Sequence, residues 1–453
     1  MKRSPIIYIL LLGLILRLVN INQSLWLDEA TSAVVARDYN WGGIWSNFLP
    51  KDFHPPLYYF ALKAWSLIFG TSEIALRMMS VVFGIAAIWM IYLIGKLAKS
   101  RSLGTVAALF LATGPLHIYY SQEVRMYMMS LFLIECAIYF FLCKKWLWFG
   151  MSLATVGLTD YLPLFIVPIF WIYGYITRSN YKWWKSFILS HIFLLAAFIV
   201  ILPIFTSQVT GGFEVKTLVA GWWNILGGTS IKNALLIPVK FVIGRISFPR
   251  LIYVGVVGFS LSLFGFVMYP SFRLKKYRFF VLWMILPILF ALVIGLFLPV
   301  LTYFRLLFVL PAVYFLLATG LMERDDKFFF PFLGAILLMN VLFSARYLAN
   351  SRFQREDWRG FTAFVNNNSG GKSIIIFPAN SQMEALNFYK PAIPYSGPIE
   401  NYRDYEEIWL MRYVWDVFDP GDKVRETIER SGFMKQSEHN FNGVLVYKYE
   451  NSN

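Results

Sequence analysis

The chain has 453 residues, of which 58% are hydrophobic and only 15% are charged, and its formal net charge is +15. A water-soluble protein of this length has too little interior to bury so much apolar surface, and two cysteines are too few for a disulfide-rich secreted fold. The composition therefore excludes soluble, disordered and disulfide-framework proteins. The basic residues lie between apolar runs, which favours the cytoplasmic loops of a multi-span membrane protein over a nucleic-acid-binding surface.

Apolar runs suited to membrane spans recur along the first 349 residues. With eleven spans, the strongly basic loops all fall on the side of the N-terminus. We therefore expect an α-helical polytopic membrane protein with a cytoplasmic N-terminus and a C-terminal segment on the outer side. The predicted spans are 6–21, 73–95, 103–121, 126–143, 146–159, 161–177, 186–206, 251–269, 279–298, 302–320 and 328–348.

The acidic residues of this region gather on one side of the predicted membrane. Glu135 lies inside a span, and Glu323, Asp325 and Asp326 lie in a cytoplasmic loop. Carboxylates at a bilayer are costly and tend to mark function, so the remaining acids indicate an active face turned outward. These acids are Asp28, Glu29, Asp38, Asp52, Glu73, Glu123, Asp160 and Glu214.

Two outer loops stand out. The first, 22–72, contains an Asp28-Glu29 pair and the segment Phe53-His54-Pro55-Pro56-Leu57. The apolar run 57–70 after the double proline favours an interfacial helix lying along the membrane. The second loop, 207–250, contains Trp222-Trp223 between glycine pairs and is expected to form interfacial helices over a substrate cleft.

Several motifs occur in a fixed order along the chain. They are Asp28-Glu29, His54-Pro55-Pro56-Leu57, Glu73-Ile74-Ala75-Leu76-Arg77, Tyr120-Ser121-Gln122-Glu123-Val124-Arg125-Met126-Tyr127, Tyr303-Phe304-Arg305 and Glu356-Asp357-Trp358-Arg359-Gly360. With these motifs the sequence resembles the GT-C glycosyltransferases, specifically the branch that includes protein O-mannosyltransferases and lipid A aminoarabinose transferases. The resemblance covers nearly the whole chain.

The resemblance implies transfer of a sugar, with a mannose-type hexose favoured, from a polyprenyl-phosphate donor to an acceptor hydroxyl on the outer face, with inversion. Asp28 would be the catalytic base, and Glu29 would orient Asp28 or the acceptor, or would have a structural role instead. The residues expected to bind the donor phosphate or sugar are His54, Arg77, Glu123, Arg125, Tyr127, Asp160, Tyr303 and Arg305. The acceptor would be a protein, lipid or glycan, and no metal, cofactor or nucleic acid is implied.

Each of these residues also has a structural alternative. Asp28 suits a helix N-cap or a solvated loop, and His54 suits a cap. An outer arginine suits an ion pair with an outer acid, for example Arg77 with Glu73 one helical turn earlier. Arg125 and Arg305 are the preferred phosphate ligands, because the planar guanidinium matches phosphate oxygens with two parallel contacts.

From about residue 350 the composition changes and the spans stop. Residues 374–377 and 444–447 are predicted strands and 421–431 a helix, so 350–453 is predicted to be a small outer α/β domain. It carries no recognisable second catalytic motif, which favours an acceptor-binding or capping role. The competing function for the whole chain is a transporter or flippase of lipid-linked sugars.

Overall fold

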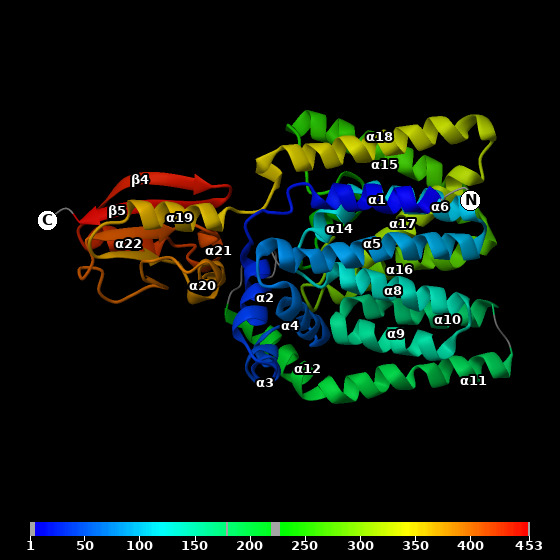
Figure 1. The fold of residues 1–453 in the computed structure, drawn as a ribbon, viewed down its shortest axis with the longest axis horizontal. Coiled ribbons are helices and arrows are strands. Elements are labelled where there is room, and N and C mark those ends of the chain that lie inside the picture. The colour runs from blue at the N-terminus through cyan, green and yellow to red at the C-terminus, as the bar shows by residue number, and fades with distance from the viewer. Residues whose placement is uncertain (1–4, 178–179, 219–226, 452–453) are drawn as a thin grey trace.

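The computed structural model describes residues 5–177, 180–218 and 227–451. A bundle of apolar helices occupies residues 5–349, and a five-stranded sheet with flanking helices follows it. The two parts lie end to end along the long axis of the molecule (Figure 1). The predicted fold class, a polytopic helical protein with a small C-terminal α/β domain, is confirmed.

The helices of the bundle follow the predicted apolar runs. In chain order they are α1 (Pro5–Leu18), α2 (Leu27–Asp38), α3 (Trp41–Gly43), α4 (Leu57–Phe69), α5 (Glu73–Ala98), α6 (Arg101–Thr113), α7 (Pro115–Ser121), α8 (Tyr127–Leu142), α9 (Trp146–Thr159), α10 (Val167–Thr177), α11 (Tyr181–Ser190), α12 (Ile192–Leu218), α14 (Ile231–Ile243), α15 (Arg250–Arg273), α16 (Arg278–Ile294), α17 (Leu310–Met322) and α18 (Asp326–Ala349).

Within the described residues, five helical segments are long and apolar enough to cross a membrane by themselves: Glu73–Ala98, Tyr181–Glu214, Arg250–Arg273, Lys275–Ile294 and Asp326–Ala349. The pair α6 and α7 forms a sixth candidate, bent by 64°. The other predicted spans coincide with shorter apolar helices, and α4 occupies the predicted interfacial segment.

The expected outer loop 207–250 is partly wrong, because α12 continues through it as far as Leu218. The hydroxyls of Thr206 and Thr210 donate to the carbonyls of Pro203 and Thr206 at 2.9 and 3.0 Å, so these polar side chains are satisfied within the helix and do not end it. A further helix, α14, follows in the same region. The predicted Trp222-Trp223 segment lies outside the described residues.

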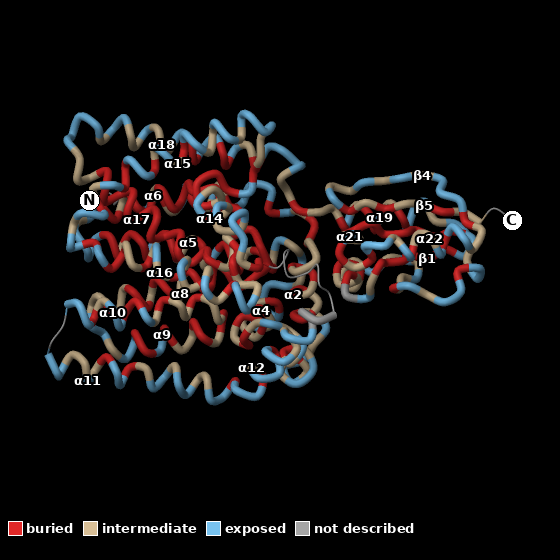
Figure 2. Tube along the Cα trace, turned by 180° about the vertical axis from the view of Figure 1, so that it is seen from behind, coloured by how far each residue is buried: buried red, intermediate tan, exposed pale blue. Residues whose placement is uncertain are grey.

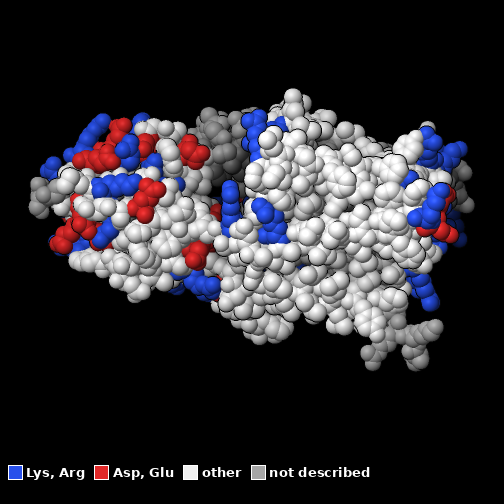
Figure 3. All heavy atoms as spheres, turned by 90° about the horizontal axis from the view of Figure 1, so that it is seen from above, with Lys and Arg blue, Asp and Glu red and all other residues white. Residues whose placement is uncertain are grey.

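Charges divide the surface of the bundle. In Figure 3 the middle of the bundle's flank is almost free of charge, while Lys and Arg lie at the end farthest from the sheet and beside the junction with the C-terminal domain. At that end, Lys99 and Lys276 each lie 2.8 Å from Glu323. This distribution agrees with a bundle whose sides face lipid and whose basic loops lie together.

The C-terminal sheet has the strand order β2-β1-β3-β5-β4. β1 pairs in parallel with β2 and β3, whereas β5 is antiparallel to β3 and β4. Both predicted strands are present, as β1 and β5, and the predicted helix is α22. The elements are α19 (Trp358–Asn368), β1 (Ser373–Ile376), α20 (Glu384–Tyr389), β2 (Tyr395–Ser396), β3 (Glu407–Met411), α21 (Trp415–Phe418), α22 (Lys423–Arg430), β4 (Phe433–Phe441) and β5 (Val444–Asn451).

The two faces of this sheet pack against different partners. Because successive strand residues point to opposite faces, Ile374 and Ile376 pack with Ile428 of α22, whereas Ile375 belongs to the apolar cluster of the other face. That second cluster includes Trp358 of α19 and is continuous with the core of the bundle. The sheet is therefore fixed to the bundle on one face. Figure 2 shows buried segments on both sides of the junction.

A close contact between glycines joins α5 and α6. A Cβ on Gly104 would lie 2.3 Å from the carbonyl oxygen of Tyr92, and one on Gly95 would lie 2.6 Å from the Cα of Gly104. Only a residue without a side chain allows the two backbones to approach so closely.

We predict that Gly104→Ala destabilises the protein by about 1–3 kcal/mol, because the methyl group forces the helices apart. Gly258→Ala on α15 is the matched control, since a Cβ there meets nothing within 4 Å, and alanine is the better helix former. Thermal unfolding in detergent compares the two variants. Equal melting temperatures for both would contradict the packing role of Gly104.

Candidate active site

Two acidic residues lie in the first turn of α2, where the positive end of the helix dipole favours carboxylates. Glu29 is fully buried, whereas Asp28 remains partly exposed. Adjacent residues of one helix thus have opposite environments. Glu29 faces the protein interior, and Asp28 faces a space that solvent reaches.

Arg77 of α5 binds Glu29 through two parallel hydrogen bonds, Nε to Oε1 at 2.9 Å and Nη2 to Oε2 at 2.6 Å. Its remaining N–H groups donate to the backbone carbonyls of residues 21, 23 and 24. All five donors of the guanidinium are therefore used, and the side chain is 1% exposed. Arg77 has no N–H left for a phosphate and instead holds α2 against α5.

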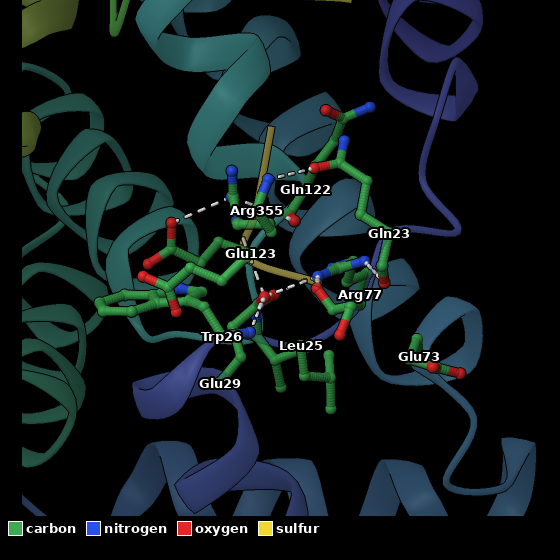
Figure 4. A network of polar contacts seen from close by, with 12 residues as sticks. Gln23, Leu25, Trp26, Glu29, Glu73, Arg77, Gln122, Glu123 and Arg355 are labelled. Carbon is green, nitrogen blue, oxygen red and sulfur yellow. Dashed lines mark hydrogen bonds and ion pairs between the residues drawn. The ribbon is translucent and has the colours of Figure 1, made fainter. Parts of the chain in front are cut away.

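A second buried arginine, Arg355, reaches the same place from the linker before the C-terminal domain. Its Nη2 donates to Glu123 Oε2 at 3.0 Å, and its Nε lies 3.6 Å from Glu29 Oε2. The guanidinium also lies over the ring of Tyr119, 3.7 Å from the centroid. The N–H of Val124 donates to Glu29 Oε1 at 2.8 Å. These contacts form one buried network (Figure 4).

The network determines how readily its two carboxyl groups ionise. Burial opposes the charge of Glu29, but Arg77, Arg355 and the Val124 N–H outweigh burial and lower the pKa of Glu29. Burial raises the pKa of Glu123 to about 7, with Arg355 opposing the rise and the charge of Glu29 adding to it. Glu29 is therefore the permanent anion of the network.

Arg125 follows this network in the loop between α7 and α8. Its Nη1 lies 3.5 Å from the backbone carbonyl of Asp28, and its Nη2 lies 3.4 Å from Nε2 of His54. Burial disfavours the charge of Arg125, but Asp28 and neighbouring acidic groups raise its pKa well above the usual range. Among the described residues its Nε has no hydrogen-bond partner. Arg125 thus lies close to both His54 and the backbone of Asp28.

His54 is oriented by a residue that the sequence analysis did not select. Its Nδ1 lies 3.2 Å from Asp52 Oδ2, which also accepts a hydrogen bond from the Tyr59 hydroxyl at 2.7 Å. Burial opposes the charge of Asp52, but His54, Arg125 and Tyr59 outweigh it, so the pKa of Asp52 is lowered. With Nδ1 held in this way, His54 presents Nε2 toward Arg125.

Three more predicted residues surround Asp28 and Arg125. Arg305 interacts electrostatically with Tyr127, Asp160 and Asp28, and its guanidinium donates to the carbonyl of Pro299. Burial raises the pKa of Asp160, while His54, Arg305 and Arg125 oppose the rise. Arg125 and Arg305 therefore both lie within electrostatic range of Asp28 and Asp160.

Tyr303 lies toward another cation, Arg245, which sequence analysis missed. Arg245 precedes α15 and donates to the hydroxyl of Tyr119 at 2.7 Å. Its guanidinium interacts electrostatically with Tyr303 and Glu123. Burial raises the pKa of Glu356, the positive charge of Arg245 opposes this rise, and the negative charge of Asp28 adds to it. Glu356 therefore lies near both residues. The C-terminal linker therefore borders the same region.

The structure separates the predicted residues into two groups. Asp28, His54, Arg125, Tyr127, Asp160 and Arg305 lie together, with Tyr303 at the side, whereas Glu29, Arg77 and Glu123 form the buried network beneath them. The alternative pairing of Arg77 with Glu73 is also wrong. Glu73 instead lies 3.3 Å from Arg359 and accepts a hydrogen bond from Tyr389 at 3.2 Å.

Asp52, Arg245 and Arg355 were not among the predicted site residues, and only Asp52 could have been predicted from the sequence. Asp52 lies two residues before His54 in a loop already selected, so its proximity could have been predicted. Arg355 is 232 residues away from Glu123 in the chain, and no local pattern reveals such a contact. Arg245 follows a glycine at the end of α14 and looks like an ordinary helix terminus.

Two surface cavities border the site without containing Asp28. One of about 600 Å³ lies between the first outer loop and α12, lined by Pro50, Lys51, Phe53, Pro203, Thr206, Ser207, Thr210, Gly211 and Glu214. Another, of about 310 Å³, lies at the junction with the C-terminal domain. Across the described part of the chain, no three His, Cys, Asp or Glu side chains gather as a metal site requires.

Part of the chain matches a family model, and the fold as a whole is similar to that of several solved structures. Residues 53–206 match the family model described as dolichyl-phosphate-mannose-protein mannosyltransferase. The structure resembles ArnT from Cupriavidus metallidurans, with a TM-score of 0.62 in the apo state (10% identity) and 0.59 bound to undecaprenyl phosphate (9% identity), each over 97% of both chains.

The chain is also similar to the archaeal oligosaccharyltransferase AglB from Archaeoglobus fulgidus, in complex with an inhibitory peptide and a dolichol-phosphate. The TM-score is 0.53 at 13% identity, over 98% of this chain and 74% of AglB. A search of curated protein sequences finds no match. Together these similarities confirm the predicted resemblance to the GT-C glycosyltransferases.

We predict that the two buried arginines respond differently to removal of their charge. Arg77→Gln strands the ionised Glu29 carboxylate in the interior and costs about 3–5 kcal/mol of stability. Arg125→Gln breaks no bidentate ion pair and is expected to remain folded. Size-exclusion chromatography and melting temperature compare the two. A stable, monodisperse Arg77→Gln variant would contradict the structural role.

Proposed function

We propose that this protein is a membrane glycosyltransferase that moves a sugar from a polyprenyl-phosphate donor to an acceptor hydroxyl at the outer face of the membrane. The observation that carries the proposal is the convergence of Asp28, His54 and Arg125. It sets a partly exposed carboxylate beside a cation, as displacement of a phosphate by a hydroxyl requires.

In the proposed reaction Asp28 is the general base. Its carboxylate takes the proton of the acceptor hydroxyl while the acceptor oxygen bonds to the anomeric carbon of the sugar. The bond between that carbon and the phosphate oxygen breaks at the same time, and its electron pair stays on the phosphate. A single displacement inverts the anomeric configuration and releases polyprenyl phosphate.

Arg125 is the proposed ligand of the leaving phosphate, together with His54 and Arg305. Arg125 is 6% exposed and has an unused donor at Nε in the described part of the chain. In such a poorly solvated place a guanidinium stabilises developing negative charge more strongly than in water. Asp52 fixes the imidazole of His54, and Asp160 and Tyr127 are the proposed contacts of the sugar.

The matched family and the similar structures suggest the donor class. The family model describes a dolichyl-phosphate-mannose-protein mannosyltransferase, ArnT binds undecaprenyl phosphate, and AglB has a structure with a peptide and a dolichol-phosphate. A mannose-type hexose on a polyprenyl phosphate is accordingly the first donor to test. The acceptor is proposed to be a protein, lipid or glycan hydroxyl, reached from the extracytoplasmic side.

We predict that Asp28→Asn lowers the release of polyprenyl phosphate by about 10²–10⁴-fold, the usual contribution of a general base. The assay supplies a panel of polyprenyl-phosphate sugars with an acceptor extract to the purified protein in lipid. Asp38→Asn is the matched control, since Asp38 ends the same helix and pairs with Arg37 at the surface.

Three results of this assay are informative. If the wild type and Asp38→Asn release polyprenyl phosphate and Asp28→Asn does not, the result supports Asp28 as the general base. The donor that reacts then identifies the sugar. If Asp28→Asn releases as much polyprenyl phosphate as the wild type, Asp28 is not the general base. No release by a folded wild type with any donor contradicts the proposed enzyme and favours a transporter or flippase of lipid-linked sugars.

We further predict that Arg125→Gln raises the KM for the donor by about 10–100-fold, the loss of one charge-assisted phosphate contact. Arg250→Gln, at the exposed start of α15, serves as control. Steady-state kinetics with the donor identified above gives the donor KM and kcat of both variants. An unchanged donor KM and kcat in Arg125→Gln would exclude contact with the phosphate.

A further inference from the structure

The proposed base and the proposed phosphate ligand each have a buried acid nearby in the chain. Glu29 follows Asp28 directly, and Glu123 lies two residues before Arg125. Both acids are at most 1% exposed. The place of Asp28 relative to Arg125 therefore depends on what holds these two carboxylates.

Arg355 contacts both acids. Its Nη2 donates to Glu123 Oε2 at 3.0 Å, and its Nε lies 3.6 Å from Glu29 Oε2. Nη2 also donates to the carbonyls of Tyr119 and Gln122 at 3.3 and 3.4 Å, at the end of α7. Arg355 thus bridges the start of α2 and the loop that carries Arg125.

The C-terminal domain fixes the backbone of Arg355. Asn442, in the turn between β4 and β5, donates from Nδ2 to the carbonyls of Ser351, Gln354 and Arg355 at 2.9, 3.4 and 2.8 Å. Asn442 and Gly443 have φ angles of 50° and 107°, the left-handed conformations that an Asn-Gly hairpin turn adopts. The sheet therefore holds the linker at the residue that enters the network.

A second contact from the C-terminal domain reaches the residues before α2. The hydroxyl of Tyr389, at the end of α20, accepts hydrogen bonds from the Leu25 N–H at 2.7 Å and from Ser24 at 3.1 Å. Arg37 of α2 donates to the carbonyls of Asn387 and Phe388. The helix that carries Asp28 is thus held by the C-terminal domain at both ends.

We propose that Arg355 is a positioning residue for the glycosyl transfer, and that the C-terminal domain sets the separation of Asp28 and Arg125 through it. This inference rests on the proposed function. The base must meet the acceptor hydroxyl while the arginine meets the phosphate, and a misplacement of about 1 Å costs about 100-fold in rate. Arg355 acts through Glu29 and Glu123 and does not touch the substrates.

The test compares Arg355→Gln with Arg359→Gln. Arg359 lies four residues further along, with a side chain 45% exposed that contacts Asn22 and Glu73. Arg355→Gln is expected to lower kcat at least about tenfold while the donor KM changes less than about threefold. Arg355→Lys keeps the positive charge and is expected to recover part of the rate, whereas Arg359→Gln retains the wild-type values.

Two kinetic outcomes overturn the proposal. A rise in donor KM with unchanged kcat makes Arg355 a donor ligand, and unchanged constants make it irrelevant to the reaction. If Arg355→Gln does not fold, Asn442→Gly replaces it, because glycine tolerates the left-handed φ and removes only the contacts with the linker. The same direction of change in kcat is expected, and no change overturns the proposal.

A readout independent of activity separates this proposal from the proposed function. The Val124 N–H donates to Glu29, so its hydrogen exchange reports whether the network is intact. Arg355→Gln is expected to speed exchange in peptides covering Val124 and the first turn of α2, and Arg359→Gln is not. Unchanged exchange overturns the positioning role, while an inactive wild type contradicts only the proposed function.

Discussion

The packing of α2 against α5 depends on a buried ion pair between Glu29 and Arg77. Bringing Glu29 and Arg77 into the interior is expensive, and the cost is offset only when each charge finds its full set of partners. Here the guanidinium uses every donor, and the carboxylate accepts from Arg77 and from the Val124 N–H. The pair therefore specifies one arrangement of α2, α5 and the loop after α7.

This arrangement gives two neighbouring acids different properties. Glu29 is held as a permanent anion with fixed partners, and Asp28, one residue earlier, is left partly exposed beside Arg125. A helix turns by about 100° per residue, so anchoring one acid in the interior necessarily turns its neighbour toward a different side. The rigid ion pair and the accessible carboxylate are two results of the same helical geometry.

Much of the fold was predictable because it follows from composition and periodicity. Apolar runs predicted the helices, and the change in composition near residue 350 predicted the α/β domain. The resemblance to a glycosyltransferase requires Asp28, His54 and Arg125 to lie near one another, and the structure places Arg125 beside the Asp28 carbonyl and the His54 ring. It could not predict that Arg77 would be saturated by backbone carbonyls, because this depends on the path of residues 21–24.

The features that could not be predicted from the sequence depend on contacts that local sequence patterns do not reveal. Arg355 and Arg245 reach the site through tertiary packing between segments far apart in the chain, and nothing in the neighbouring sequence distinguishes them from arginines that lie on the surface. The extension of α12 was missed because threonine hydroxyls satisfied within a helix look the same in the sequence as those that end one.

The contacts of α2 with Arg355 and Tyr389 also have a consequence for biosynthesis. The chain is made from its N-terminus, so α2 leaves the ribosome more than 300 residues before the segments that hold it. Until the segment that carries Arg355 has been translated and has folded against α2, Glu29 has Arg77 but not Arg355 as a cationic partner. The contacts around α2 are therefore complete only after Tyr389 has been translated, and a chain truncated before Arg355 displays Asp28 without the surroundings that orient it.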